Sequence, residues 1–138
     1  MSRLVAWTVH LAALASGLTG VAYGVIRFFL EPSDEFSLWN HPSEPLWKTS
    51  HILLSPLLLF ACGLIWRDHA WERIQDGDED RRKSGLLLFA LLLPMAASGY
   101  LLQVSEDEGW RQLWSLSHAG LGLLWTLGYL LHQLLPDD

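Results

Sequence analysis

The chain has 138 residues, of which 51 % are hydrophobic and only 17 % are charged, and it contains eight tryptophans. This composition is typical of a membrane protein and argues against an ordinary soluble domain, in which charges are spread over the surface. The formal charge of −6 argues against nucleic-acid binding, and the single cysteine, Cys62, cannot form an internal disulfide.

Four apolar runs separate short segments that contain nearly all of the charges. The first run, residues 4–30, has His10 near its start and Arg27 near its end, and it is long enough to cross a bilayer. We therefore predict a retained transmembrane helix rather than a cleaved signal peptide. Gly17 and Gly24 lie near the helix face of His10, where small residues either allow close helix packing or leave room for a porphyrin.

The second run, residues 47–66, follows a proline-rich acidic segment, residues 31–48, that is predicted to be a loop. His51 lies one turn inside the run. His41, in the loop, has no second ligand at metal-binding spacing and is expected to be structural or exposed. After the run comes a polar connection, residues 67–85, whose His69 is expected at the membrane interface.

The third run, residues 86–103, contains neither histidine nor charge and is predicted to form a wall of the bundle. The fourth run, residues 110–135, contains His118 and His132, fourteen positions apart. On an α-helix this spacing places the two side chains ~21 Å apart and within ~40° of the same face.

The helix face between these two histidines suits a flat cofactor. Gly122 lies on it, where a cofactor can approach the backbone, and Trp125 and Tyr129 can pack beside it.

These runs predict an all-α integral membrane protein, an antiparallel four-helix bundle that forms a single domain over residues 1–138. Basic residues number six on one side of the membrane and three on the other, which places the N-terminus and the C-terminus in the cytoplasm. The six are Arg3, Arg67, Arg73, Arg81, Arg82 and Lys83, and the three are Arg27, Lys48 and Arg111.

In this orientation the four intramembrane histidines pair by depth. His10 and His132 lie near the cytoplasmic face, and His51 and His118 share a depth near the periplasmic face. A lone intramembrane histidine is more often hydrogen-bonded to a neighbouring helix than bound to iron. Because ionisable residues are costly in a membrane and neutral imidazole is a common haem ligand, four histidines that match by pairs favour two bis-histidine haem sites.

This layout resembles the bacterial cytochrome b561 family of four-helix, di-haem transmembrane cytochromes b. In that family one histidine on the first helix, one on the second and two on the fourth, fourteen apart, bind two haems b. His10, His51, His118 and His132 occupy those positions. The resemblance implies a multi-pass protein of the bacterial inner membrane, with His10 and His132 on the cytoplasmic haem iron and His51 and His118 on the periplasmic one.

The implied function is electron transfer within the membrane lipid, between the quinone pool and a redox partner. The resemblance also includes a role as a quinol or superoxide oxidoreductase. One alternative is a haem-bearing anchor for the catalytic subunit of a larger oxidoreductase. Another is a histidine-lined proton or metal transporter, although the four apolar cores contain no acidic residues to accompany the histidines.

Other polar residues have supporting roles in this hypothesis. Each ligating imidazole must donate its second N–H, either to a helix carbonyl or to a hydroxyl such as Ser55 or Ser115. Arg27, Lys48 and Arg111 are candidates to bind haem propionates, or are simply topological anchors.

Acidic residues are concentrated in the predicted periplasmic loops. They either steer a basic periplasmic redox protein toward the nearby haem or only keep the loops solvated. The seven residues are Glu31, Asp34, Glu35, Glu44, Glu106, Asp107 and Glu108.

Overall fold

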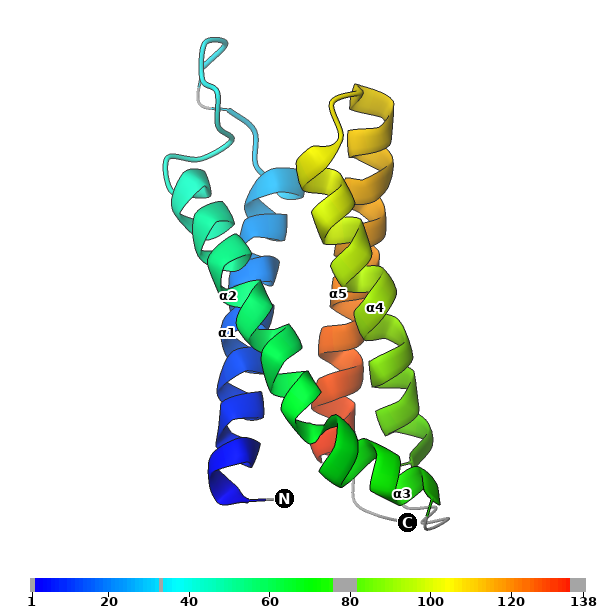
Figure 1. Ribbon diagram of the computed structural model, residues 1–138. Coiled ribbons are helices and arrows are strands. Elements are labelled where there is room, and N and C mark those ends of the chain that lie inside the picture. Colours follow the sequence, from blue (N-terminus) through cyan, green and yellow to red (C-terminus); the bar gives the residue numbers. More distant parts are fainter. Residues whose placement is uncertain (1, 33, 76–81, 135–138) are drawn as a thin grey trace. The chain divides into compact units, whose positions relative to one another are not determined.

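The computed structural model describes residues 2–32, 34–75 and 82–134 (Figure 1). Every regular element in these ranges is helical and none of their residues forms a strand, which confirms the all-α prediction for this part of the chain. The predicted end of the fourth span, residue 135, and Arg81 lie outside the described residues. The chain divides into two compact units, Met1–Ile65 and Trp66–Asp138.

The first unit is an antiparallel pair of helices, α1 (Arg3–Phe29) and α2 (Glu44–Ile65) (Figure 1). The side chain of Ser2 caps α1 by accepting a hydrogen bond from the backbone N–H of Val5, at 3.3 Å. Small buried residues on both helices, including Ala13 and Ala61, let the two backbones approach closely.

The loop between these helices is shorter than predicted, because α2 begins at Glu44 rather than near residue 47. Pro45 favours this early start, since a proline in the first turn lacks only an N–H that has no partner within the helix. The Glu44 carboxylate is 3 % exposed and accepts a hydrogen bond from the backbone N–H of Asn40, at 2.8 Å. The side-chain amide of Asn40 in turn donates to the backbone carbonyls of Ile26 and Arg27 at the end of α1.

The second unit begins with η1 (Trp66–Trp71), a π-helical segment, and the short helix α3 (Glu72–Gln75). The first part of the predicted polar connection is therefore helical. Aromatic residues explain the difference, because the Trp66 ring packs edge-on against Phe89, with ring centroids 5.1 Å apart. A hydrophobic contact of this kind stabilises helical structure in an otherwise polar segment.

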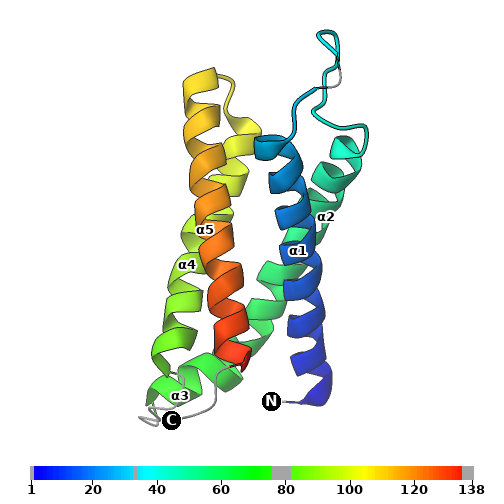
Figure 2. The same cartoon turned by 180° about the vertical axis from the view of Figure 1, so that it is seen from behind.

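The second unit also contains an antiparallel pair of long helices, α4 (Arg82–Val104) and α5 (Glu108–Leu134) (Figure 2). Each of the four long helices covers the predicted apolar run to within about one helical turn. Asp107 caps α5, since its carboxylate accepts a hydrogen bond from the backbone N–H of Trp110, at 3.0 Å.

Three of the helices are long and apolar enough to cross a membrane by length and composition: α1, α2, and α4 from Lys83 onward. Their surfaces agree with a lipid environment, because Leu4, Leu11 and Leu18 recur every seventh residue of α1 and are each more than half exposed. Helix α5 is as long as α1 but is not one of the three. Its histidines and the polar residues near its start, such as Arg111 and Gln112, lower its average hydropathy.

Candidate functional site

In the first unit, the imidazole of His51 lies against one short stretch of α1. Its Nδ1 atom is 3.1 Å from the backbone carbonyl oxygen of Ser16 and 3.3 Å from the hydroxyl of Thr19. A Cβ atom added at Gly20 would be only 2.8 Å from Cε1 of the ring. The ring therefore occupies space that only glycine leaves open on this face of α1.

In the second unit, the imidazole of His118 lies against α4 in the same way. Its Nδ1 atom is 2.8 Å from the backbone carbonyl oxygen of Met95 and 3.4 Å from the hydroxyl of Ser98. A Cβ atom added at Gly99 would be 2.9 Å from Cε1 of the ring.

The two histidines thus share one arrangement, which we call the carbonyl–hydroxyl–glycine site. It consists of a helix carbonyl at position n, a hydroxyl residue at n+3 and a glycine at n+4, and it occurs at residues 16–20 and 95–99. The Ser98 hydroxyl also donates to the Met95 carbonyl, at 2.8 Å. The Thr19 hydroxyl lies 3.2 Å from the Ser16 carbonyl but is closer to the Ala15 carbonyl, at 2.7 Å.

This arrangement indicates that Nδ1 is the donor nitrogen in both rings. A backbone carbonyl only accepts hydrogen bonds, so Nδ1 of each imidazole must carry the hydrogen. In the neutral ring the lone pair then lies on Nε2, which is the nitrogen that can bind iron. Metal-binding histidines usually donate their other N–H to a carbonyl or carboxylate in this way, so His51 and His118 have the chemistry required of haem ligands.

His132 is positioned by a related but different contact near the start of α4. Its Nδ1 atom is 2.8 Å from the hydroxyl of Ser84, and a Cβ atom added at Gly85 would be 3.7 Å from Cε1 of the ring, an ordinary contact distance. A hydroxyl both donates and accepts, so this contact alone does not fix which ring nitrogen carries the hydrogen.

The two sites on α4 are in register with the two histidines of α5. Gly99 contacts His118 and Gly85 contacts His132. The two glycines are fourteen residues apart on α4, as the two histidines are on α5, and they follow in the opposite order because the helices are antiparallel. Helix α4 contains no histidine and was predicted to be only a wall. In the structure it also contacts both histidine rings of its neighbour.

His10 is half-buried on α1, and the ring of Trp7 lies edge-on to it with centroids 6.0 Å apart. Each predicted ligand pair, His10 with His132 and His51 with His118, takes one histidine from each unit. The pairing therefore remains a prediction.

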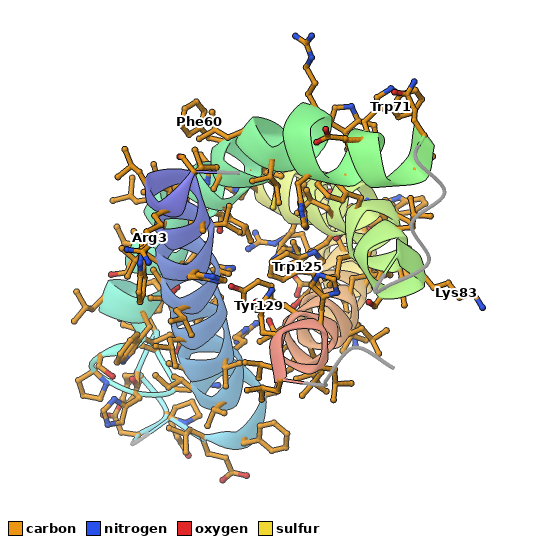
Figure 3. All side chains as sticks on the ribbon, turned by 90° about the horizontal axis from the view of Figure 1, so that it is seen from below. Arg3, Phe60, Trp71, Lys83, Trp125 and Tyr129 are labelled. Atoms are coloured by element: carbon orange, nitrogen blue, oxygen red, sulfur yellow. The ribbon has the colours of Figure 1, made fainter. Side chains whose placement is uncertain are left out.

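Between the two histidines of α5, the predicted aromatic residues pack on each other. The rings of Trp125 and Tyr129, both labelled in Figure 3, are stacked with centroids 5.5 Å apart, and both residues are buried. The indole N–H of Trp125 donates to the backbone carbonyl of Leu88 on α4, at 3.0 Å. A Cβ atom at Gly122 would come no closer than 4.0 Å to the Met95 sulfur, so this glycine leaves modest space.

The remaining predicted residues have local surroundings. Arg27 and Arg111 are exposed near helix ends, and the Lys48 ammonium lies 5.9 Å from the centre of the Trp39 ring, in cation–π geometry. His41 is exposed, as expected, and its Nδ1 lies 2.8 Å from the Ser43 hydroxyl.

The other glycines of α1 and His69 lie outside the carbonyl–hydroxyl–glycine sites. Gly17 is half-buried on α1, whereas a Cβ atom at Gly24 would meet nothing within 4 Å. His69 is half-buried in η1.

Sequence reasoning missed the hydroxyl and glycine residues that hold the rings. Ser55, one of the two hydroxyls expected to accept an imidazole N–H, instead donates to the backbone carbonyl of His51, at 2.6 Å. A signal was present, because serine–glycine pairs recur fourteen residues apart in the third apolar run and its flank, the same spacing as the two histidines of the fourth. These pairs are Ser84–Gly85 and Ser98–Gly99.

Comparisons with protein-family models, with curated proteins and with solved structures found no match to this chain. Among the described residues, no three histidine, cysteine, aspartate or glutamate side chains gather into a site for a bare metal ion. A haem iron, by contrast, needs only two axial ligands from the protein.

Proposed function

We propose that this chain is a di-haem b transmembrane electron-transfer protein, which passes electrons between the quinone pool and a redox partner. In this proposal α5 is the fourth membrane span of a four-helix bundle, and both termini are cytoplasmic in a bacterial inner membrane. The observation that carries the proposal is the pair of carbonyl–hydroxyl–glycine sites, which prepare His51 and His118 to bind iron through Nε2.

The role of these sites follows from what an iron ligand needs. A ligating imidazole must keep one nitrogen unprotonated and must not rotate away from the metal. In each unit Nδ1 donates a hydrogen bond to a backbone carbonyl, of Ser16 or of Met95, which leaves Nε2 of the neutral ring unprotonated. The same hydrogen bond and the contact with a glycine keep the ring from rotating. A histidine that only filled a packing position would not require the same three-part arrangement in two helix pairs of different sequence.

Bound haem iron supplies the one-electron chemistry, and the chain supplies four imidazoles, apolar surroundings and anchoring charges. We propose that His10 and His132 form one axial pair and that His51 and His118 form the other. Two imidazoles on each iron would leave no position open for oxygen, which suits electron transfer. Arg27, Lys48 and Arg111 remain our candidates for contacts to the propionates.

Haem content tests this function directly. The purified protein is expected to contain two haems b per chain in a pyridine haemochrome assay, with low-spin signals in the reduced-minus-oxidised spectrum. His41→Ala is a matched control, because His41 is exposed outside the helices and its loss should leave both haems bound. One haem or none in the wild-type chain would refute the proposal.

A further inference from the structure

Helix α4 contacts the two histidines of α5 with chemically different acceptors. We propose that Ser84 is a positioning residue that tunes the reduction potential of one haem through the Nδ1 of His132, and that at His118 this role belongs to the Met95 carbonyl rather than to Ser98. The inference rests on the proposed function, since it concerns how the chain adjusts a bound haem.

The distances from the two serine hydroxyls to the imidazoles of His132 and His118 differ. The Ser84 hydroxyl lies 2.8 Å from Nδ1 of His132, which is within the range of a strong hydrogen bond. The Ser98 hydroxyl lies 3.4 Å from Nδ1 of His118, whereas the Met95 carbonyl oxygen lies 2.8 Å from the same atom. Two serines fourteen residues apart on one helix thus differ in what their hydroxyls do for the neighbouring imidazole.

The Ser98 hydroxyl has a second task that explains this difference. It donates its hydrogen to the Met95 carbonyl, at 2.8 Å, and is 3 % exposed. Removing it takes one donor from a carbonyl that still accepts from His118. Removing the Ser84 hydroxyl takes the close acceptor itself away from His132.

The electronic consequence follows from the direction of the hydrogen bond. When Nε2 of a neutral imidazole binds iron, Nδ1 carries the hydrogen, so Nδ1 must donate and the Ser84 oxygen must accept. An acceptor on Nδ1 raises the basicity of the ligand and favours the oxidised iron. Loss of that acceptor should therefore raise the reduction potential of the haem bound by His132.

The test is a spectroscopic redox titration of the haem-loaded protein and of three variants. Ser84→Ala should keep two haems and raise one midpoint, with a change in the reduction equilibrium of about tenfold, or ~59 mV for one electron. Ser84→Thr keeps a hydroxyl and should leave both midpoints near their wild-type values. Ser98→Ala leaves the Met95 acceptor of His118 in place, so any midpoint shift it causes should be well below that of Ser84→Ala, at about twofold or ~18 mV.

The affected haem can be identified independently. The midpoint that moves in Ser84→Ala should be the one that disappears in His132→Ala, and the low-spin ferric EPR signal of the same haem should shift. A Ser84→Ala protein with two haems and unchanged midpoints would overturn the inference, as would an equal shift in Ser98→Ala. Haem counted in the wild-type chain tests the proposed function separately, because a count of two with no shift refutes only the role of Ser84.

Discussion

The two units of the chain reach the same histidine geometry from different sequences. In the first unit the supporting stretch of α1 reads SGLTG, and in the second the stretch of α4 reads MAASG. Only the hydroxyl residue and the final glycine are shared in kind, because the principal acceptor is a backbone carbonyl and needs no particular side chain. The sequence requirement of the site therefore lies in the hydroxyl residue and the glycine, and not in the first residue.

The largest expected effect comes from removing the histidines. His51→Ala and His118→Ala should each abolish the same haem and leave the other, although the two residues belong to different units. His10→Ala and His132→Ala should abolish the other haem. The measurement is haem content per chain, combined with a redox titration that shows which midpoint is lost.

Two outcomes would contradict this assignment of the histidines. If His51→Ala and His118→Ala removed different haems, the pairing by depth would be wrong. If His69→Ala removed a haem while His10→Ala did not, the assignment of the ligand from the first helix would be wrong.

Substitution of the glycines by alanine should give the next largest effect. It should distinguish the tight sites of His51 and His118 from the looser contact of His132. A methyl group at Gly99 would lie 2.9 Å from the His118 ring and one at Gly20 would lie 2.8 Å from the His51 ring, so each ring must move. Overpacking of this kind costs about 1–3 kcal/mol, and we expect Gly20→Ala and Gly99→Ala to weaken retention of the same haem. The measurement is loss of the Soret band during heating.

Gly85→Ala is the matched control for these variants. Its added methyl group would lie 3.7 Å from the His132 ring, an ordinary contact, so haem retention should stay near that of the wild-type chain. A loss as large as that of Gly99→Ala would mean that the His132 ring is held as tightly as the other two.

The helices, and the presence of a histidine on each of three of them, could be predicted from the sequence because apolar length and residue spacing are local properties. The start of α2 was missed by about one turn because Pro45 and Glu44 read as loop residues, although both fit the first turn of a helix. The aromatic contact that orders η1 was also missed, since it depends on Phe89 in a different helix.

The support of the histidine rings was harder to predict because it depends on register between helices. Ser84 and Ser98 lie far in sequence from His132 and His118, and only the antiparallel packing of α4 on α5 places them together. The backbone acceptors Ser16 and Met95 leave no side-chain signal at all, because every residue except proline offers the same carbonyl and N–H.

A smaller effect should follow from Trp125, which tests whether α4 supports α5 apart from the histidines. Trp125→Phe removes the hydrogen bond to the Leu88 carbonyl and shrinks a ring that is only 4 % exposed, so unfolding should become easier by about 1–3 kcal/mol. Both haems should remain bound. The measurement is the midpoint of thermal unfolding, with Trp110→Phe, at an exposed position, as the control; loss of a haem in Trp125→Phe would instead place this residue in direct contact with the cofactor.

The smallest expected effect concerns the acidic loops. Both units have exposed acids, which in the first unit are Glu31, Asp34 and Glu35. Glu44 of the first unit is buried and hydrogen-bonded, so it contributes little to a field outside the protein. Glu106, Asp107 and Glu108 of the second unit are all exposed, the first two before α5 and the third at its first position. If this turn steers a basic redox partner, the electron-transfer rate should fall with added salt, because the Debye length shortens to ~8 Å at physiological ionic strength.

Stopped-flow kinetics with a basic redox protein measure this steering. Glu106→Gln, Asp107→Asn and Glu108→Gln together should lower the rate a few-fold at low salt and make it nearly independent of salt. Asparagine is chosen at position 107 because its side-chain oxygen can still accept from the backbone N–H of Trp110, so that the cap of α5 is preserved while the charge is removed. A rate that is indifferent both to salt and to these substitutions would mean that the turn only starts the helix and that partner recognition lies elsewhere on the chain.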